Sequence, residues 1–282
     1  MSKKYSKRSV HLADTTDITA LARAVLETAD PHEKAKQAHA VAALWRGGAC
    51  IIPETAKPVA DRPARPTRPE LVAPGDVPRR RLNGPAGRIA LLHAVAHIEL
   101  NAVDLAFDLV ARFAADKAIA DERRHDFVSD WISVGDDEAR HFRLISDRLA
   151  KLGGAYGDMP AHDGLWDAAT ATRESLAARI AIAPMVLEAR GLDVTPGMID
   201  RLVSVGDTDS ADCLRVIYTE EIAHVAAGVR WFRHLAARAG KDPANWFKSL
   251  VHKHYGGALK PPFNDEARAS AELFPEFYQS LT

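Results

Sequence analysis

Two stretches of this 282-residue chain each place a histidine three residues after a glutamate, a spacing that suits metal binding on a helix. Residues i and i+3 share one helical face, about 4.5 Å apart along the axis, so each pair offers a carboxylate and an imidazole to the same point. Two further glutamates lie in apolar stripes of the preceding helices. The sequence therefore predicts a ligand set for two metal ions: Glu99, Glu138, His141, Glu188, Glu221 and His224.

Spacing alone is weak evidence, because the chain contains a third such pair, Glu122 and His125. In two antiparallel helices joined by a turn, residues at equal height are equidistant from that turn. The midpoint between Glu99 and Glu138 falls inside 115–121, which has the character of a turn. Pairing Glu99 with Glu122 would instead place the turn inside an apolar run. We therefore expect Glu122 to lie at a solvated helix start.

The same test supports the second pair of helices. The midpoint between Glu188 and Glu221 falls beside Gly206, a residue type that commonly ends a helix. Apolar residues flank the predicted ligands at helical spacing, so these carboxylates should point inward. An uncompensated buried carboxylate costs several kcal/mol or takes up a proton, which makes bound cations the simpler explanation. The alternative, glutamates at the edge of the core paired with arginines, is less favoured.

The elements that must position these ligands are four long helices. Apolar periodicity predicts them at about 86–115, 120–151, 165–192 and 209–239, with a crossover at 152–164 and a short extra helix at 196–205. The predicted fold class is all-α. The domain division is an N-terminal helical pair within 1–52, a proline-rich arm at 53–86, the four-helix bundle at 87–240 and a C-terminal helical extension at 241–282, with helices near 244–254 and 269–280.

Prolines are dense in the arm, which excludes regular helix and central strand there. Its arginines could form a patch for an anionic partner such as RNA, or they could pair with acidic side chains while the arm wraps the bundle. We favour the second interpretation, because the arm has almost no aromatic side chains on which bases could stack. These arginines are Arg62, Arg65, Arg68, Arg79, Arg80 and Arg81.

The composition sets limits on partners and location. With 37 basic and 38 acidic residues the net charge is −1, so no global field would recruit nucleic acid or an anionic membrane. The basic start of the chain is followed by no apolar run of signal-peptide or membrane-spanning length, so we expect a cytoplasmic protein without a membrane partner. Two cysteines, Cys50 and Cys213, are too few for a disulfide framework or a thiolate metal site.

The order Glu, Glu-x-x-His, Glu, Glu-x-x-His resembles the ferritin-like di-iron carboxylate superfamily. More narrowly, four segments resemble an uncharacterised bacterial family of ferritin-like domain proteins, and the likeness spans most of the chain. The resemblance implies a ferritin-like four-helix bundle and a metal site, but no substrate. The segments are 68–74, 77–80, 87–99 and 136–142.

The resemblance also implies how the ligands divide between the metals. One ion would take Glu99, Glu138 and His141, the other would take Glu188, Glu221 and His224, and Glu138 and Glu221 would bridge. Carboxylates with two imidazoles suit iron, with manganese or a mixed pair as alternatives. Two ferrous ions could reduce dioxygen, which would then be a co-substrate.

Three more residues are candidates for a part in the chemistry. Asp137 and Glu220 each precede a ligand glutamate and could hydrogen-bond the outer nitrogen of an imidazole, or they could be solvated carboxylates. Segment 137–141 resembles the Asp-Glu-x-Arg-His pattern of the superfamily oxygenases. In the second half of the chain Glu220 stands where that pattern has aspartate. Tyr218 could contact a ligand or carry a radical, although packing is the commoner role. Pro184 could open a channel beside Glu188 or be a tolerated kink.

Three functions follow from these features, in order of preference. The first is an oxygen-activating oxidoreductase, a hydroxylase or oxidase that needs an electron donor protein and acts on a small molecule or, less favoured, a modified RNA. The second is iron or peroxide handling of the ferritin or rubrerythrin kind. The third is a non-catalytic metal-binding scaffold, since a fold does not imply a function. A monomer and a homodimer both remain open.

Overall fold

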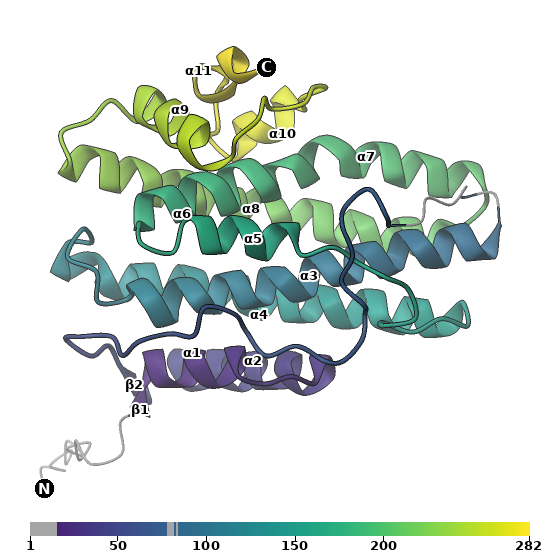
Figure 1. Cartoon of the computed structure of the whole chain (residues 1–282), viewed down its shortest axis with the longest axis horizontal. Helices are drawn as coiled ribbons and strands as arrows, with labels where there is room; N and C mark the ends of the chain where they lie inside the picture. The colour runs from purple at the N-terminus through teal and green to yellow at the C-terminus, as the bar shows by residue number, and fades with distance from the viewer. Residues whose placement is uncertain (1–15, 78–81, 83) are drawn as a thin grey trace, which may run out of the picture.

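The structure is a computed structural model that describes residues 16–77, 82 and 84–282. The protein is all-α apart from two short strands, and its helices stack in layers (Figure 1). A long pair, α3 (Pro85–Phe113) and α4 (Arg124–Lys151), lies against an N-terminal pair, α1 (Ile18–Leu26) and α2 (Pro31–Arg46). The strands β1 (Thr16–Asp17) and β2 (Cys50–Ile51) pair in parallel beside α1. This N-terminal pair confirms the helices predicted within 1–52.

The second long pair is α7 (Ala189–Ser204) and α8 (Thr208–Arg238), on the other side of α3 and α4 (Figure 1). Gly206 turns the chain between them with a φ of 77°, and the Asp207 carboxylate accepts the Ser210 amide N–H to cap α8. Between α3 and α4 the chain turns at 114–120, and a short 3-10 helix, η2 (Asp121–Arg123), leads into α4. Both turns therefore lie where the midpoints of the glutamate pairs require them.

The helix predicted at 165–192 differs from the structure. It is interrupted: α5 (Gly164–Ala171) ends before α6 (Leu176–Ile182), which Ser175 caps by accepting the Ala178 amide N–H. From Leu176 the helix then continues through a π-helical segment, η3 (Ala183–Glu188), and through α7 without a break. The separate helix predicted at 196–205 is therefore wrong, because it is the second half of α7.

A tertiary contact lets α7 run through Pro196. Proline has no amide hydrogen, so the carbonyl of Leu192 loses its usual helical partner four residues on. The Asn264 side chain donates a hydrogen bond of 3.1 Å to that carbonyl instead. Asn264 belongs to the C-terminal extension, which is remote from Pro196 in the sequence. The extension therefore supplies the hydrogen bond that the proline removes.

The C-terminal extension covers one end of α7 and α8 with α9 (Pro243–His254), α10 (Asp265–Ser270), α11 (Pro275–Tyr278) and a 3-10 turn, η4 (Gln279–Leu281) (Figure 1). The helix predicted near 244–254 matches α9. The single amphipathic stretch predicted at 269–280 is divided, because the backbone at Glu272 turns through a φ of 58°.

Close approach of η3 to α8 depends on a glycine. A Cβ built on Gly228 would lie 2.7 Å from the Cβ of Pro184 and 2.8 Å from its Cγ. Because the proline ring cannot rotate away, only glycine lets the two segments approach this closely. This contact fixes the position of η3, which ends at Glu188, against the helix that carries Glu221.

Gly228→Ala is expected to lower the free energy of unfolding by about 1–3 kcal/mol, the usual range for overpacking. Urea unfolding followed by circular dichroism measures the change. Gly197→Ala is the matched control, since nothing lies within 4 Å of a Cβ at that exposed position of α7, and it should raise stability by about 0.5–1 kcal/mol. Equal effects of the two substitutions would contradict the packing argument.

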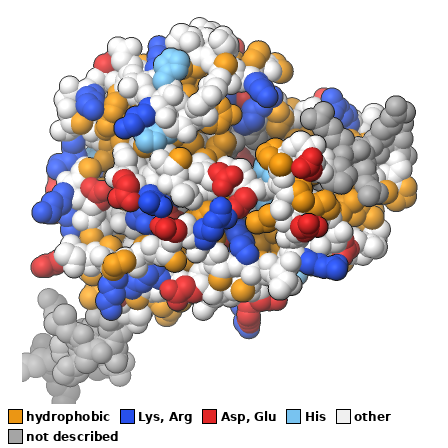
Figure 2. Space-filling view, viewed as in Figure 1, with side chains coloured by type: hydrophobic (Ala, Val, Ile, Leu, Met, Phe, Trp, Pro, Cys, Tyr) orange, Lys and Arg blue, Asp and Glu red, His pale blue; other side chains and the backbone are white. Residues whose placement is uncertain are grey.

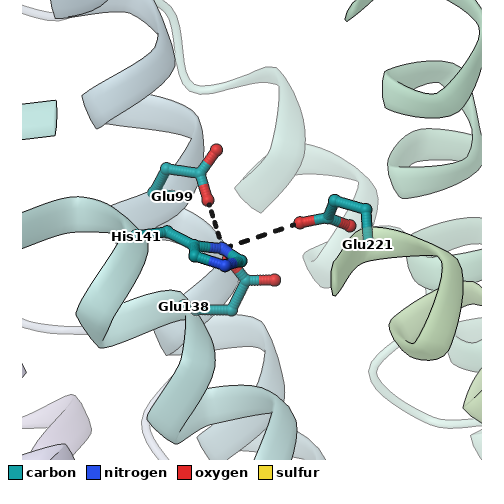
Figure 3. A group of neighbouring side chains, drawn as sticks. All are labelled: Glu99, Glu138, His141 and Glu221. Carbon is teal, nitrogen blue, oxygen red and sulfur yellow. Dashed lines mark ion pairs between the residues drawn. The ribbon is translucent and has the colours of Figure 1, made fainter. Parts of the chain in front are cut away.

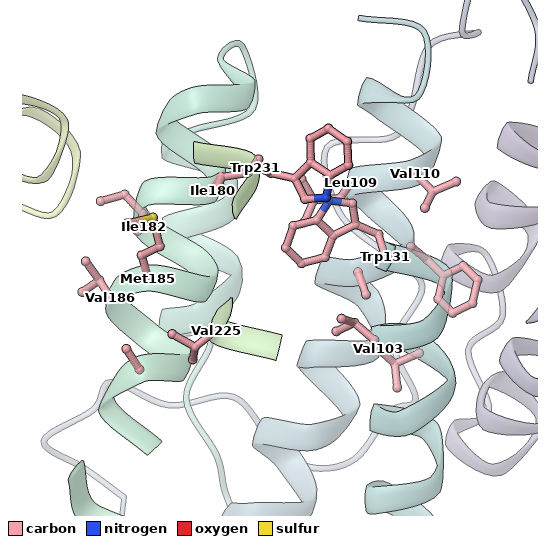
Figure 4. Packing of buried hydrophobic residues seen from close by; sticks show 14 of the residues in the cluster. Val103, Leu109, Val110, Trp131, Ile180, Ile182, Met185, Val186, Val225 and Trp231 are labelled. Carbon is pink, nitrogen blue, oxygen red and sulfur yellow. The ribbon is translucent and has the colours of Figure 1, made fainter. Parts of the chain in front are cut away.

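Aromatic side chains seal the interior between the two long pairs (Figure 4). Trp131 of α4 and Trp231 of α8 are both buried, and the ring of Phe127 packs against both. The Trp231 indole N–H donates to Asp130 at 2.7 Å, which satisfies its one polar atom. Trp131 lies two turns from Glu138, and Trp231 two turns from His224. This cluster therefore closes the interior on one side of the predicted site.

Helix α3 is the central core helix. Among the described residues it is the one helix long and apolar enough to cross a membrane by length and composition, but 72% of that stretch is buried inside the protein. It also carries buried acidic residues with charged partners, such as Asp108, which pairs with Arg112 of the same helix and with Arg179 of α6. These features are those of a core helix.

The arm crosses the outer side of α3 and is held by its arginines. Arg62 pairs with Asp163, and Arg65 pairs with Asp104 at 2.9 Å and donates to Asn101 at 2.6 Å. These two contacts agree with the interpretation that the arm wraps the bundle. Arg68 is exposed, and Arg79, Arg80 and Arg81 lie outside the described residues. On the face seen in Figure 2, acidic and basic side chains are interspersed, in keeping with the net charge near zero.

Candidate metal centre

The six predicted ligands come from four segments that meet in the interior. Glu99 is on α3, Glu138 and His141 are on α4, Glu188 ends η3, and Glu221 and His224 are on α8. Four of them offer one oxygen or nitrogen atom each, and these atoms all lie within 4.8 Å of one another (Figure 3). The four are Glu99, Glu138, His141 and Glu221. This buried cluster could hold a metal ion.

The two imidazoles face the cluster through the same ring atom. His141 Nδ1 lies 3.2 Å from Glu99 Oε2 and 3.4 Å from Glu138 Oε2. His224 Nδ1 lies 3.0 Å from the other oxygen of Glu138 and 3.5 Å from Glu221 Oε1. Glu138 therefore lies between the two histidines, with one oxygen toward each.

Glu188 takes a more open position. Its carboxylate lines the same cavity as Glu99, Glu138 and Glu221, but among the described residues it forms no ion pair with His141 or His224. Four ligands are thus brought together directly, His224 contacts two of them, and Glu188 lines the adjoining cavity.

Each of the six residues has at least one buried side-chain atom without a hydrogen-bond partner. These atoms are Glu99 Oε2, both oxygens of Glu138, His141 Nδ1, Glu188 Oε2, Glu221 Oε2 and His224 Nδ1. Buried polar atoms without partners are costly and uncommon, so their concentration at one point needs an explanation. These seven oxygen and nitrogen atoms, on six residues, are of the kind that binds divalent cations.

Two outer carboxylates reach crosswise between α4 and α8. Glu220 of α8 contacts Nε2 of His141 at 2.6 Å, and Asp137 of α4 contacts Nε2 of His224 at 3.4 Å. Arg140 links the two carboxylates, donating to Asp137 at 2.6 Å and to Glu220 at 3.2 Å. A carboxylate on the outer nitrogen places the ring proton there and leaves Nδ1 free to bind a metal.

Asp137→Asn and Glu220→Gln are each expected to weaken metal binding by about 10–100-fold while the ligands stay in place. Titration with Mn²⁺ against a competing chelator measures the change. Because a general loss of structure would also weaken binding, thermal unfolding of the metal-free variants is the control. A change of less than about twofold in both variants would show that these carboxylates do not tune the imidazoles.

Arg140 was not predicted as a functional residue. The sequence does contain a signal for part of its role, because Arg140 follows Asp137 at i+3, the spacing of an ion pair on one helical face. Its second partner, Glu220, is 80 residues away and became evident only from the packing of α4 against α8.

The metal-free cluster holds protons. Burial, reinforced by neighbouring carboxylates, raises the pKa of Glu99 and of Glu188 well above 4.5, and it also raises the pKa of Glu221. Burial opposes charge on the imidazoles as well, but Glu138 and Glu99 outweigh it and raise the pKa of His141 to about 11. Contacts with Glu221 and Asp137 likewise raise the pKa of His224 well above 6.5.

Glu138 is the exception. Burial acts to raise its pKa, yet the two imidazoles overcome that effect and hold the pKa below its ordinary value. These shifts favour an ionised Glu138 between two protonated histidines in the metal-free cluster. Metal ions would have to displace these protons, which couples metal binding to pH.

The structure separates the other candidates from this cluster. The Tyr218 hydroxyl accepts a hydrogen bond of 2.9 Å from Asn264 of the C-terminal extension, an arrangement that favours a packing role. Glu122 and His125 are exposed at the start of α4, as the midpoint test requires. Pro184 lies in the π-helical segment η3, packed against Gly228 of α8, and it is not one of the residues that line the cavity described next.

A cavity of about 170 Å³ adjoins the cluster, between α3, α5, α7 and α8. Four glutamates form its floor: Glu99, Glu138, Glu188 and Glu221. The other walls are mostly apolar, and they include Val95, Ala102, Leu165, Val194, Met198 and Leu214. Ile98 also lines it and is 45% exposed, so the cavity reaches the surface there. The site can thus accept a molecule with apolar surface next to the carboxylates.

Comparison with known proteins identifies the family. The family described as "Protein of unknown function (DUF455)" matches residues 27–279, which is most of the chain. The chain belongs to this family. The matched residues include the arm, all six predicted ligands and most of the C-terminal extension.

A curated relative and the solved structures add little about activity. An "Uncharacterized protein" of Haemophilus influenzae is 40% identical over 208 residues, which cover 74% of this chain and 72% of that protein. No solved structure matches the chain. Membership of the DUF455 family therefore does not indicate an activity for this protein, and the function has to be inferred from the site.

Proposed function

We propose that this protein is a ferritin-like dinuclear metalloprotein, with iron as the favoured metal, that oxidises a small organic substrate with dioxygen. The observation that supports this most is the position of the metal-ligand cluster at the floor of an apolar cavity. Glu99, Glu138 and His141 would hold one ion, and Glu188, Glu221 and His224 the other, with Glu138 and Glu221 shared. Two ferrous ions would supply electrons for the reduction of dioxygen.

The residues of this chain would provide three things for that reaction. The carboxylates balance the charge of two divalent ions, which keeps them stable in the interior. Asp137, Glu220 and Arg140 fix the orientation of the imidazoles. The Trp131 and Trp231 cluster and the apolar cavity walls keep water away, which protects a reactive site from side reactions.

The cavity distinguishes this proposal from iron storage or a scaffold. A protein that only stores iron needs a path for ions, whereas this cavity presents mainly apolar walls to its contents. Its dimensions suit a small molecule, and two of the arm arginines are already paired with acidic side chains, so we propose no RNA substrate. Repeated turnover would require an electron donor protein. We propose that both proteins are located in the cytoplasm.

Metal analysis followed by reaction with oxygen tests the proposal. The full-length protein is expressed with iron and with manganese, and its metal content is measured. It is then reduced under anaerobic conditions and mixed with oxygen while its absorption spectrum is recorded. About two ions per chain and a transient oxygen-dependent absorption support the proposal. Zinc or no metal, without any response to oxygen, would overturn it. Steady accumulation of ferric iron on repeated Fe²⁺ addition would instead indicate iron handling.

A further inference from the structure

A second cavity, of about 210 Å³, lies directly outside the first. The two share four wall residues: Ile98, Leu165, Leu187 and Arg190. The far wall of this outer cavity comes from the C-terminal extension, including Tyr255, Leu259 and Phe263. Because four residues line both, the two cavities are adjacent to each other.

Positively charged side chains outnumber acidic ones in the wall of the outer cavity. Arg190, Lys260 and Arg268 line it, with Asp193 as the single acidic residue. Arg268 already uses Asp193, donating from Nε at 2.8 Å and from Nη2 at 2.7 Å. Arg190 Nη1 lies 3.4 Å from the same carboxylate, so one acidic side chain is shared by two arginines and the wall of this cavity keeps a net positive charge.

One of these cations has a buried donor without a partner. The Arg268 side chain is only 3% exposed, and its Nη1 has no hydrogen-bond partner. The aromatic rings of Phe263 and Tyr278 flank the guanidinium at 4.8 and 4.5 Å and hold it in place. A buried, immobilised guanidinium nitrogen is costly unless an acceptor reaches it, and carboxylates and phosphates are the acceptors that arginine prefers.

Arg190 is also positioned for a ligand. Its Nη1 donates to the backbone carbonyls of Lys260 at 2.7 Å and of Pro262 at 3.1 Å, which ties the C-terminal extension to α7. The arginine thereby stands at the junction of the two cavities, in the wall of both. Arg190 therefore lines the same outer cavity as Arg268 and Lys260, and it shares Asp193 with Arg268.

We propose that the outer cavity binds the anionic head of the substrate, a carboxylate or phosphate, whose apolar tail enters the inner cavity. Arg190, Lys260 and the Nη1 of Arg268 would hold the head, and Leu165, Leu187 and Ile98 would contact the tail. This inference rests on the proposed function for the reaction, but binding itself requires no metal. The substrate class is thus an amphiphile with a single anionic group.

The two cavities fix the direction in which such a molecule binds. Apart from Arg190, which lines both cavities, the inner cavity offers an anion only carboxyl groups, Thr195 and apolar walls. Two divalent ions would only neutralise these carboxylates, whereas the outer cavity has an excess of positive charge. The head should therefore stay in the outer cavity, and the apolar end should lie next to the cluster.

Binding of three ten-carbon probes to the full-length protein tests this. Decanoate, decyl phosphate and the uncharged decanol are titrated calorimetrically into metal-free and Mn²⁺-loaded protein. At least one anionic probe should bind about tenfold more tightly than decanol in both forms, since hydrogen bonds to charged groups are the stronger ones. Equal affinity of all three probes would overturn the proposal.

Variants locate the head and the tail. Arg190→Gln with Lys260→Gln should weaken the anionic probes about tenfold and leave decanol and metal content unchanged. Lys253→Gln, an exposed lysine of α9 outside the cavity, is the matched control. Arg268 is left intact because it also anchors Asp193. If the double variant binds decanoate and decyl phosphate as tightly as the control does, the head does not bind there.

Leu187→Trp tests the path between the cavities. The larger side chain in the shared wall should weaken decanoate but leave the six-carbon hexanoate unchanged, because the shorter tail does not need the inner cavity. An unchanged affinity for decanoate would overturn the path. Failure of the oxygen reaction in the metal-loaded protein would count against the proposed function, whereas the charge preference of the metal-free protein tests only this inference.

Discussion

Glu138→Ala is expected to abolish the binding of both metal ions while helical content is retained. Glu138 presents one oxygen toward each histidine, 3.4 Å from His141 Nδ1 and 3.0 Å from His224 Nδ1, so its removal takes a ligand from both ions at once. Alanine is a strong helix former, so helix α4 should be retained. Elemental analysis of the purified protein and far-ultraviolet circular dichroism measure the two properties.

The chain supplies a matched control for this substitution. Glu122→Ala removes a glutamate of the same helical motif, three residues before a histidine, but at an exposed position. It should leave metal content at the wild-type value. Glu138→Gln, which keeps the size of the side chain and removes its charge, should lose metal as Glu138→Ala does. Wild-type metal content in both Glu138 variants would refute the ligand assignment.

Metal removal is expected to reverse the pH dependence of stability. In the metal-free protein the pKa values of Glu99, Glu188 and Glu221 are raised above 4.5, and that of His141 is raised from 6.5 to about 11. A raised pKa contributes stability that is complete below the unfolded value and is lost as the pH rises toward the folded value. The metal-free protein should therefore lose stability steadily between about pH 5 and pH 8.

Bound metal should give the opposite slope. The ligands are then deprotonated in the folded state, so the unfolded state binds more protons and stability rises with pH. At free metal one hundred times the dissociation constant, one site adds about 2.7 kcal/mol to the free energy of unfolding. Urea unfolding with excess chelator and with Mn²⁺, from pH 5 to pH 8, gives both curves. Parallel curves would mean that the clustered groups do not exchange protons for metal.

Three carboxylates have the opposite effect on the pH dependence of stability: Glu138, Asp137 and Glu220. Their pKa values are lowered in the folded protein, because the histidines and Arg140 outweigh the effect of burial. A lowered pKa contributes stability that is lost as the pH falls below the unfolded value, about 4 for these carboxyls. The metal-free protein should therefore be most stable near pH 5 and less stable on either side.

Much of the fold was predictable from local patterns. The boundaries of α3, α4 and α8 follow from apolar periodicity and from the residues that end or cap helices, which act within one or two turns. The third long helix was not predictable in this way. Its course through Pro196 depends on Asn264, which supplies a hydrogen bond from a distant part of the chain. Local propensity cannot anticipate such a partner.

The ligand residues were visible in the sequence because helical geometry is regular. Because each residue advances a helix by a fixed rise, the number of residues between a glutamate and the turn gives its position along the helix axis. Residue numbers alone therefore pair Glu99 with Glu138 and Glu188 with Glu221. Residue type and burial then indicate metal-binding chemistry. The sequence by itself determined an all-α protein with six candidate ligands on four helical segments.

The tertiary structure decided how those ligands are used. The crosswise contacts of Glu220 with His141 and of Asp137 with His224, and the bridge through Arg140, depend on how α4 and α8 pack. The two cavities depend on where α5, α7 and the C-terminal extension meet. These features join residues far apart in the chain, and no local periodicity encodes the space between packed elements, so only the folded arrangement could reveal them.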